Sequence, residues 1–487
     1  MGIYKRNPFP ESLLQDESCN IQVLKCLIRF LPAAGNRNGT NVNKVQNNGN
    51  YWSATENNSN NANYLNFNSD EANMNNNNRN NGQSVRLVKH LPYDDTLLTD
   101  LFRAYYDARR NKRNTRSQLR FELNLETNLI HLYHDLRSRK YRPSPSICFV
   151  IEDSVKREVF ASEFRDRVVH HLYWNYVADL FDRLFIYDSY SCRKGKGTLK
   201  GIERLEHHIR SATHNFTREA WVLQLDIQGY FMHIRRDMLY DMVVEVLQQY
   251  GMTDPLLLYL TDVIILKDPL DGCRYCGKPT DWDGLPDSKC LSKQPHGVGL
   301  PIGDLTSQLF SNIFLNRLDR FVQYDLGFRH YGRYVDDFWL VDTSKERLRS
   351  AIEPIRVFLR EMGMTLHPKK IRLYPCKERV SFLGAVCAPY YRHASDRTTK
   401  KFHDKLLMWE KDLENLSSMT DKQERERWLM DCRACVNSYL GYLGHFKADG
   451  LVYRELRGLK LLEVFEVEKT QNTRLGKIVQ SLVTESS

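Results

Sequence analysis

This sequence of 487 residues lacks two features of exported and membrane proteins. No run of about 18 apolar residues occurs, the length that a helix needs to cross a bilayer. Residues 1–20 also lack the apolar core of a signal peptide. We therefore expect a cytoplasmic protein with no membrane partner.

A pattern that demands disulfides is also missing, although the chain has 11 cysteines. A reducing cytosol keeps such thiols free. Cys273 and Cys276 have the spacing of zinc ligands, and Cys290 and His296 follow as candidate partners. Because these partners are irregularly spaced, zinc binding is an alternative to the ordinary packing of these side chains.

The charge balance indicates a polyanionic partner. Lys and Arg number 70 against 60 Asp and Glu, so the formal net charge is +10. The basic residues gather in residues 109–120 and 193–200, which suits contacts with nucleic acid. The length allows a large core and more than one domain.

The first part of the chain has a different composition. Between residues 36 and 81 nearly half of the residues are Asn. Such a segment has too little apolar area to offset the entropy of ordering the chain, so its composition predicts disorder.

Two strands that carry Asp at their ends are the most informative feature. Residues 221–231 read WVLQLDIQGYF, an apolar strand that ends at Asp226. Residues 333–341 read RYVDDFWLV, which predicts strand, tight turn and strand, with Asp336 and Asp337 at the turn. Two such carboxylate clusters suit a pair of Mg²⁺ ions about 3.5–4 Å apart, the arrangement used for phosphoryl transfer.

These strands resemble the catalytic strands of reverse transcriptases, where an Asp-x-x-x-aromatic-aromatic strand faces a Tyr-x-Asp-Asp hairpin. Further blocks follow in the family's order at residues 156–159, 164–171, 187–198, 299–308, 363–370 and 380–384. The resemblance implies an α+β fold of the right-hand polymerase type, with fingers, a palm built on an antiparallel sheet, and a helical thumb. It also implies an RNA-directed DNA polymerase that uses template RNA, a cDNA or other primer, and dNTPs.

On this basis we expect four parts. Residues 1–88 are the Asn-rich, largely disordered segment, and residues 89–220 hold N-terminal helices and the fingers. Residues 221–392 form the palm, with an insertion at 267–296, and residues 393–487 form the thumb and a C-terminal tail. Apolar residues at helical spacing predict helices from Thr96, over 126–139, over 402–416 and over 428–443.

The resemblance assigns the chemistry to four side chains and one carbonyl group. Asp226 and Asp336 would ligate both Mg²⁺ ions, helped by the Ile227 carbonyl oxygen. Asp337 would be a third, weaker ligand. Lys370 would protonate the pyrophosphate leaving group, by its position in its block.

The resemblance also implies where the substrates bind. Phe231 would be a steric gate that clashes with a ribose 2′-hydroxyl. The other expected nucleotide-binding residues are Lys156 and Arg157 at the triphosphate, with Ile302, Gly303 and Gln308. The expected template and primer contacts are Arg193, Lys194, Lys196, Leu383 and Gly384. The turn around Lys196 lacks the spacing of a P-loop, so we expect it to contact template phosphates without reading sequence.

One block narrows the resemblance. Most of the superfamily carries Pro-Gln-Gly followed by Ser-Pro, whereas here Ile302 stands between Pro301 and Gly303, and Gln308 follows Ser307. This is similar to the reverse transcriptases of diversity-generating retroelements, which copy a template-repeat RNA into cDNA with mutated adenines. The resemblance then implies a bacterial or phage-encoded protein whose partner is a small, basic, oligomeric accessory variability protein.

The Asn-rich segment fits the same interpretation. Residues 36–88 resemble the tail of the C-type-lectin-like variable proteins that these retroelements diversify. Asn codons are rich in adenine, so the segment resembles a translated template repeat. A genuine Asn-rich linker is the alternative.

Three other functions are alternatives to a retroelement reverse transcriptase. A group II intron-type polymerase with maturase activity is expected to need a further domain after the thumb. A phage-defence reverse transcriptase leaves the Asn-rich segment unexplained. A non-catalytic RNA-binding scaffold predicts the loss of an acid, but Asp226, Asp336 and Asp337 are all present.

Overall fold

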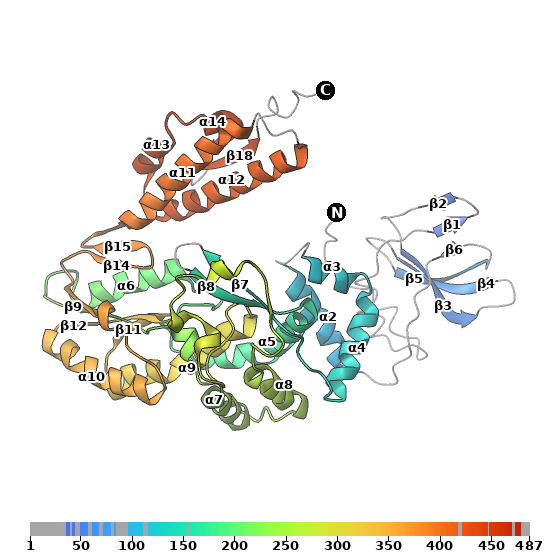
Figure 1. Ribbon diagram of the computed structural model, residues 1–487, viewed down its shortest axis with the longest axis horizontal. Coiled ribbons are helices and arrows are strands. Elements are labelled where there is room, and N and C mark those ends of the chain that lie inside the picture. The colour runs from blue at the N-terminus through green and yellow to red at the C-terminus, as the bar shows by residue number, and fades with distance from the viewer. Residues whose placement is uncertain are drawn as a thin grey trace. The chain divides into compact units, whose positions relative to one another are not determined.

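The computed structural model describes residues 96–110, 115–152, 156–416, 421–446, 448–469 and 473–478, and the backbone of six strands between residues 36 and 83. The chain divides into two compact units. Unit 1 consists of Met1–Ile147, Ala161–Tyr176 and Thr253–Ile264, and unit 2 consists of Cys148–Phe160, Val177–Met252 and Ile265–Ser487. Figure 1 traces the elements of both. No helix within these described ranges is long and apolar enough to cross a membrane.

The backbone of the Asn-rich segment has regular strands where composition predicts disorder. Two antiparallel sheets are present, in the orders β2-β1-β6 and β3-β4-β5. The strands are β1 (Asn36–Asn38), β2 (Asn41–Asn43), β3 (Gly49–Glu56), β4 (Asn61–Phe67), β5 (Ala72–Asn78) and β6 (Gly82–Gln83). Strands β3 and β4 contain Tyr, Trp, Leu and Phe, which favour strands. The side chains of this segment lie outside the described residues.

Unit 1 is helical apart from these strands. Its elements are α2 (Thr96–Arg109), α3 (Arg116–Glu122), α4 (Leu125–Arg137), the start of α5 (Phe164–Leu184) and most of α8 (Pro255–Leu266). The helices predicted from Thr96 and over residues 126–139 are confirmed by α2 and α4. Leu97, Leu101 and Tyr105 of α2 are buried, as their spacing predicts.

Unit 2 is built around a four-stranded antiparallel sheet in the order β11-β12-β9-β13. The strands are β9 (Trp221–Asp226), β11 (His330–Tyr334), β12 (Asp337–Asp342) and β13 (Arg372–Pro375). Trp339 and Val341 share a core with helix α6 (Thr198–Ala212), which covers one face of the sheet. Helix α10 (Lys345–Glu361) covers the other face (Figure 1). The protein is therefore a mixed α and β structure.

Smaller sheets and helices surround this sheet in unit 2. The small sheets are β10-β7-β8, β14-β15-β16 and β17-β18. Their strands are β7 (Ile147–Glu152), β8 (Lys156–Ala161), β10 (Arg274–Tyr275), β14 (Val380–Phe382), β15 (Ala385–Ala388), β16 (Tyr391–Ala394), β17 (Phe465–Lys469) and β18 (Thr473–Ile478). The remaining helices before residue 390 are η2 (Tyr230–His233), α7 (Arg236–Gln249), η3 (Pro279–Trp282), η4 (Asp287–Lys289), η5 (Leu291–Lys293), α9 (Leu305–Arg320), η6 (Phe321–Asp325) and η7 (Pro368–Lys370).

The C-terminal part is mainly helical, as the apolar spacing predicts. Its helices are α11 (Asp396–Leu416), α12 (Lys422–Leu443), η8 (Gly444–Phe446), α13 (Asp449–Leu456) and α14 (Leu461–Val464). Phe402 and Leu406 of α11 pack with Cys432 of α12 in the same buried cluster as Trp339. Cys432 is therefore an ordinary core residue.

Candidate functional site

The backbone register brings the first pair of acids together. Strand β9 ends at Asp226, strand β12 begins at Asp337, and these two residues are directly opposite each other. Side chains alternate between the faces of a strand, so both carboxylates lie on the face that also carries Trp339 and Val341. Further along the strands, the side chains on that face are buried in the core. The two acids lie at the end of the strands, where they are only partly buried.

Asp336 sits in the two-residue turn between β11 and β12, whose last pair is Tyr334 and Asp337. Val335, the first residue of the turn, has a φ of 56°, as the first residue of a type II′ turn does. This conformation is strained for a β-branched residue, so the surroundings must hold it. The Asp336 carbonyl oxygen accepts a hydrogen bond from the Ile227 amide at 3.1 Å, which fixes the turn beside the residue that follows Asp226.

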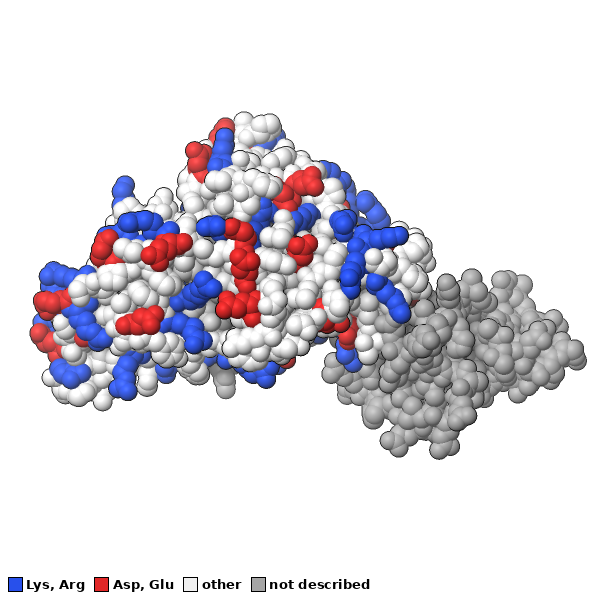
Figure 2. All heavy atoms as spheres, turned by 90° about the horizontal axis from the view of Figure 1, so that it is seen from below, with Lys and Arg blue, Asp and Glu red and all other residues white. Residues whose placement is uncertain are grey.

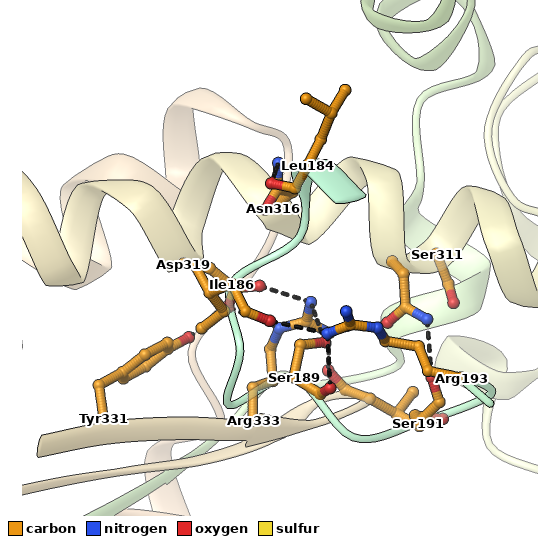
Figure 3. A network of polar contacts seen from close by, with 12 residues as sticks. Leu184, Ile186, Ser189, Ser191, Arg193, Ser311, Asn316, Asp319, Tyr331 and Arg333 are labelled. Carbon is orange, nitrogen blue, oxygen red and sulfur yellow. Dashed lines mark hydrogen bonds and ion pairs between the residues drawn. The ribbon is translucent and has the colours of Figure 1, made fainter. Parts of the chain in front are cut away.

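A buried arginine supports this turn. The Arg333 side chain is fully buried, and its Nη1 donates to the Val335 carbonyl oxygen at 3.0 Å. Its Nε and Nη2 each lie 2.7 Å from a carboxylate oxygen of Asp319, on α9. The Tyr331 hydroxyl donates to the same carboxylate at 2.6 Å. Figure 3 shows how this network joins the strand to the helix.

The pKa values of Asp336 and Asp337 are raised. Burial and then the Asp226 carboxylate raise the pKa of Asp336 to about 6. Burial, Asp226 and Asp336 together raise the pKa of Asp337 to about 7. Lys370 lowers the pKa of both residues, and Arg157 also lowers that of Asp336, though by less than the raising effects. The site therefore gathers negative charge that a cation would stabilise.

Lys370 already brings one cation to this cluster. Its ammonium group lies 2.8 Å from a carboxylate oxygen of Asp226 and is half exposed. Lys370 ends η7, which is held against β9 because the His367 amide donates to the Asp226 carbonyl oxygen at 2.8 Å. The ammonium group thus places a positive charge beside Asp226, where the sequence predicts a metal ion.

Strand β8 carries two basic residues that differ in exposure and in their contacts. Arg157 is exposed and close enough to Asp336 to lower its pKa. The Lys156 ammonium instead donates to the carbonyl oxygens of Asp283 at 2.8 Å and Asp281 at 3.3 Å. Arg157 is therefore the more accessible candidate for a triphosphate contact.

Tyr230 and Phe231 follow β9 and differ in burial. Tyr230 is buried, and its hydroxyl donates to the Ser311 carbonyl oxygen. Phe231 is only partly buried, and its carbonyl oxygen accepts from the Leu300 amide at 2.8 Å. This bond places the loop before α9 next to the expected gate residue.

The loop before α9 also contacts β8. The Phe160 amide donates to the Ile302 carbonyl oxygen at 2.8 Å. Gly303 has a φ of 139°, and a Cβ atom there would collide with the Phe160 carbonyl oxygen, so the approach of loop and strand requires glycine. Gln308 is exposed in the first turn of α9. Ile302 and Gly303 therefore lie against β8, the strand that also carries Arg157, and Phe231 contacts the same loop at Leu300.

Two stretches of the chain match known family models. Residues 157–387 match the family model described as reverse transcriptase (RNA-dependent DNA polymerase). This part of the chain is therefore similar to reverse transcriptase domains. Residues 14–88 match a second model, described as a domain of unknown function (DUF8237). A search of curated proteins found no match.

A solved structure is also similar. It is apo telomerase from Candida tropicalis truncated from its C-terminal domain, with 11% sequence identity and a TM-score of 0.39. The match covers 55% of this chain and 60% of the telomerase chain.

Reverse transcriptases use divalent metal ions, and the donor chemistry of this domain suits them. Asp226, Asp336 and Asp337 offer only oxygen ligands, which Mg²⁺ prefers. No three His, Cys, Asp or Glu side chains within the described ranges are gathered closely enough to form a ready metal site. The acids fit the ions in chemistry and charge, while Lys370 occupies one of the carboxylate oxygens.

The loop that is expected to contact the template is partly turned inward. Arg193 is nearly buried, lies 2.6 Å from the Asp182 carboxylate, and donates to the Ile186 carbonyl oxygen at 2.7 Å. These contacts hold the loop, and the expected contact of Arg193 with a template phosphate stays a prediction. Lys196 lies 3.3 Å from the centre of the Tyr187 ring, and Lys194 is exposed.

The final block of the domain forms a second tight turn. Leu383 and Gly384 have φ values of 50° and 83° and connect β14 to β15. The Leu383 carbonyl oxygen accepts from the Tyr442 hydroxyl at 3.1 Å, which attaches the turn to α12. The Gln224 amide group donates to the Ser381 carbonyl oxygen at 2.7 Å, so the same hairpin is attached to strand β9.

The zinc alternative finds no support in the positions of its ligands. His296 is almost fully exposed and pairs with Asp268 at 3.0 Å. Cys290 is buried, whereas Cys276 is exposed. Burial raises the pKa of Cys273 and Cys290, which favours neutral thiols.

Charge on the surface is mixed. On the face drawn in Figure 2, basic and acidic side chains are interspersed over the described residues. Part of the first basic cluster, residues 111–114, lies outside those residues. Within the cluster, Arg109 pairs with Glu122 and the exposed Arg110 pairs with Asp107.

Proposed function

We propose that unit 2 synthesises cDNA on an RNA template at a centre formed by Asp226, Asp336 and Asp337. The observation that carries the proposal is the register that sets Asp226 opposite Asp337, with Asp336 in the adjoining turn. The arrangement of sheet, surrounding helices and C-terminal helices supports a right-hand polymerase with fingers, palm and thumb.

The side chains divide the work of nucleotide addition. When bound, two Mg²⁺ ions would activate the attacking 3′-hydroxyl and balance charge on the phosphorus and the leaving pyrophosphate. Asp226 and Asp336 would hold these ions, with Asp337 and the Ile227 carbonyl oxygen in support. Lys370 is near the acids and half exposed, which suits a group that gives a proton to the pyrophosphate.

The neighbouring residues would position the nucleotide. Arg157 would attract the triphosphate, since it is exposed and its charge reaches Asp336. The partly exposed Phe231 ring would exclude a ribose 2′-hydroxyl, and Ile302, Gly303 and Gln308 would border the nascent base pair. Lys194 and the turn at Leu383 and Gly384 would contact template and primer.

We further propose that the enzyme serves a diversity-generating retroelement. The apolar Ile302 in place of a Gln, the Ser307–Gln308 pair and the Asn-rich segment support this. The template would be a repeat RNA, and the partner a small basic accessory variability protein. Because residues 14–88 match a protein family model, a working N-terminal domain is the alternative to a translated repeat.

The central test is metal-dependent synthesis by the full chain with primer, template RNA, dNTPs and Mg²⁺. Asp336→Asn should lower the rate by at least ~10³, because an ion ligand and its charge are lost. Asp325→Asn, at an exposed acid that ends η6, is the matched control and should keep the wild-type rate. Near-native synthesis by both Asp226→Asn and Asp336→Asn would refute the assignment of the centre.

The accessory partner has a separate test. Co-expression with a candidate basic protein encoded beside the enzyme should give a complex by size exclusion, with higher cDNA yield. If the two proteins elute independently at micromolar concentration, the partner proposal fails while the polymerase assignment stands.

A further inference from the structure

Strand β8 has two faces with different contacts. Side chains alternate along a strand, so Lys156, Glu158 and Phe160 share one face and Arg157 lies on the other. The first face is fastened to residues 267–296, the segment between α8 and the loop that leads into α9. Lys156 reaches the carbonyl oxygens of that segment, and Phe160 packs with Leu291. Arg157 remains exposed.

Glu158 is the central residue of the fastened face. Its side chain is fully buried, and one carboxylate oxygen accepts from Trp282 Nε1 at 2.9 Å and from the Cys290 thiol at 3.5 Å. The other oxygen accepts from the Leu291 amide at 2.7 Å. These three donors belong to residues 282–291, and the Cys148 thiol of β7 also contacts the Glu158 carboxylate. All four donors are neutral.

A buried carboxylate held by neutral donors is an unusual way to fix a strand. An unpaired charge is costly to bury, and apolar side chains would fill the same space at lower cost. Unlike apolar packing, the Glu158 carboxylate makes directional contacts. One oxygen fixes the position of β8 relative to Trp282, and the other fixes it relative to Leu291.

The same contacts continue to the nucleotide loop. Leu291 packs in one buried cluster with Phe160 and Met232, and the partly buried Ile302 and Trp282 pack against that cluster. A Cβ atom at Gly299 would collide with the end of the Leu291 side chain, so the loop runs directly against this leucine. Displacing residues 282–291 would therefore move Ile302 together with β8.

We propose that residues 282–291 are a positioning brace that grips Glu158 so that Arg157, on the opposite face of β8, is presented to the incoming triphosphate. This inference rests on the proposed role of Arg157 in nucleotide binding. Glu158 and Trp282 are then positioning residues, which act on the substrate through Arg157.

The test compares steady-state constants of three variants of the full-length enzyme. Glu158→Gln turns an amide NH₂ toward donors that need an acceptor, and Trp282→Phe removes the Nε1 donor while keeping a ring. Each should raise the KM for dNTP about tenfold, the effect of one lost hydrogen bond to a charged group, with kcat and the KM for primer–template changed less than about twofold. Tyr275→Phe, at an exposed ring of the same segment, should match the wild type.

A double-variant cycle separates positioning from simple stabilisation. In an Arg157→Ala background, Glu158→Gln should raise the KM for dNTP no further, because the residue through which it acts is gone. An unchanged KM in Trp282→Phe, or full additivity with Arg157→Ala, would overturn the brace. Trp282→Phe leaves every charge in place, so it decides the question even where Glu158→Gln does not fold.

The proposed catalytic centre is tested independently of the brace. Wild-type synthesis that depends on Asp336, combined with a wild-type KM in both brace variants, would refute the brace alone. Loss of dependence on Asp336 would refute the centre.

Discussion

Asp319 and Arg333 form a bidentate ion pair in which both side chains are completely buried. Asp319 belongs to α9 and Arg333 to β11, so the pair joins a helix to the sheet. The remaining Nη1 of Arg333 donates to the Val335 carbonyl oxygen. Arg333 thereby holds the strained turn at Val335, which carries the proposed metal ligand Asp336.

The first prediction separates stability from catalysis in this pair. Arg333→Met should destabilise the fold by about 3–5 kcal/mol, because it leaves Asp319 buried without its partner. The double variant Arg333→Met with Asp319→Leu should recover most of that stability. It should still make cDNA at least ~10 times more slowly, because the Val335 carbonyl oxygen has lost its donor.

Urea unfolding and primer extension measure the two effects. Arg347→Met is the control, since the Arg347 side chain is about half exposed and its ion pair with Asp342 should be worth below about 1 kcal/mol. A double variant that is both stable and fully active would show that the arginine does not position the turn.

The second prediction concerns pH and Mg²⁺. The pKa values of Asp336 and Asp337 are raised to about 6 and about 7, so the folded protein holds more protons than the unfolded chain between about pH 4 and pH 7. Without metal, their contribution to stability therefore falls as the pH rises through this window. Mg²⁺ requires ionised carboxylates, so the gain in Tm from Mg²⁺ should be larger at about pH 8 than at about pH 5.5.

Thermal unfolding at both pH values, with and without Mg²⁺, checks this. Asp337→Asn should make the metal-free protein more stable than the wild type at about pH 8, because a buried charge is removed, and should reduce the gain from Mg²⁺. An equal Mg²⁺ effect at both pH values would contradict the linkage.

Local patterns in the sequence predicted much of this centre. The apolar run that ends at Asp226, the two-residue turn at Asp336, and the helices α2, α11 and α12 follow from residues that are neighbours in the chain. Such patterns determine periodicity and turn chemistry, which act over a few residues.

The supporting contacts were not predictable in the same way. Glu158 and Trp282 are 124 residues apart, and no local pattern pairs them. A signal did exist, because Glu158 precedes the apolar Val159 and Phe160 in a strand that reads as buried. The inward position of Arg193 was not predictable either, because its loop is basic throughout and no local pattern indicates that this side chain pairs with Asp182.

The third prediction concerns the N-terminal segment. Deleting residues 1–88 removes the match to the domain of unknown function and ends before α2 begins at Thr96. With template RNA supplied separately, synthesis should stay within about twofold of the wild type, since an Asn-rich segment can bury little apolar surface. A parallel loss of Tm and activity would show instead that this segment is a working domain.

The last prediction is about fidelity and concerns Ile302. Its carbonyl oxygen is fixed by Phe160, and its partly buried side chain packs beside the cluster of Phe160, Met232 and Leu291. A Gln at this place would offer a hydrogen bond near the nascent pair, and one that only correct geometry satisfies is worth about 1–3 kcal/mol. Ile302→Gln should therefore improve nucleotide selectivity by roughly one to two orders of magnitude.

Sequencing of cDNA made by the wild type, Ile302→Gln and the apolar control Ile302→Leu measures this selectivity. The wild type and Ile302→Leu should share a high substitution rate, because neither side chain can make the hydrogen bond. The resemblance to retroelement enzymes further predicts that wild-type errors gather opposite template adenine. The absence of that excess would refute the retroelement proposal, whereas an unchanged error rate in Ile302→Gln would refute only the account of Ile302, because the polymerase centre at Asp226, Asp336 and Asp337 does not depend on it.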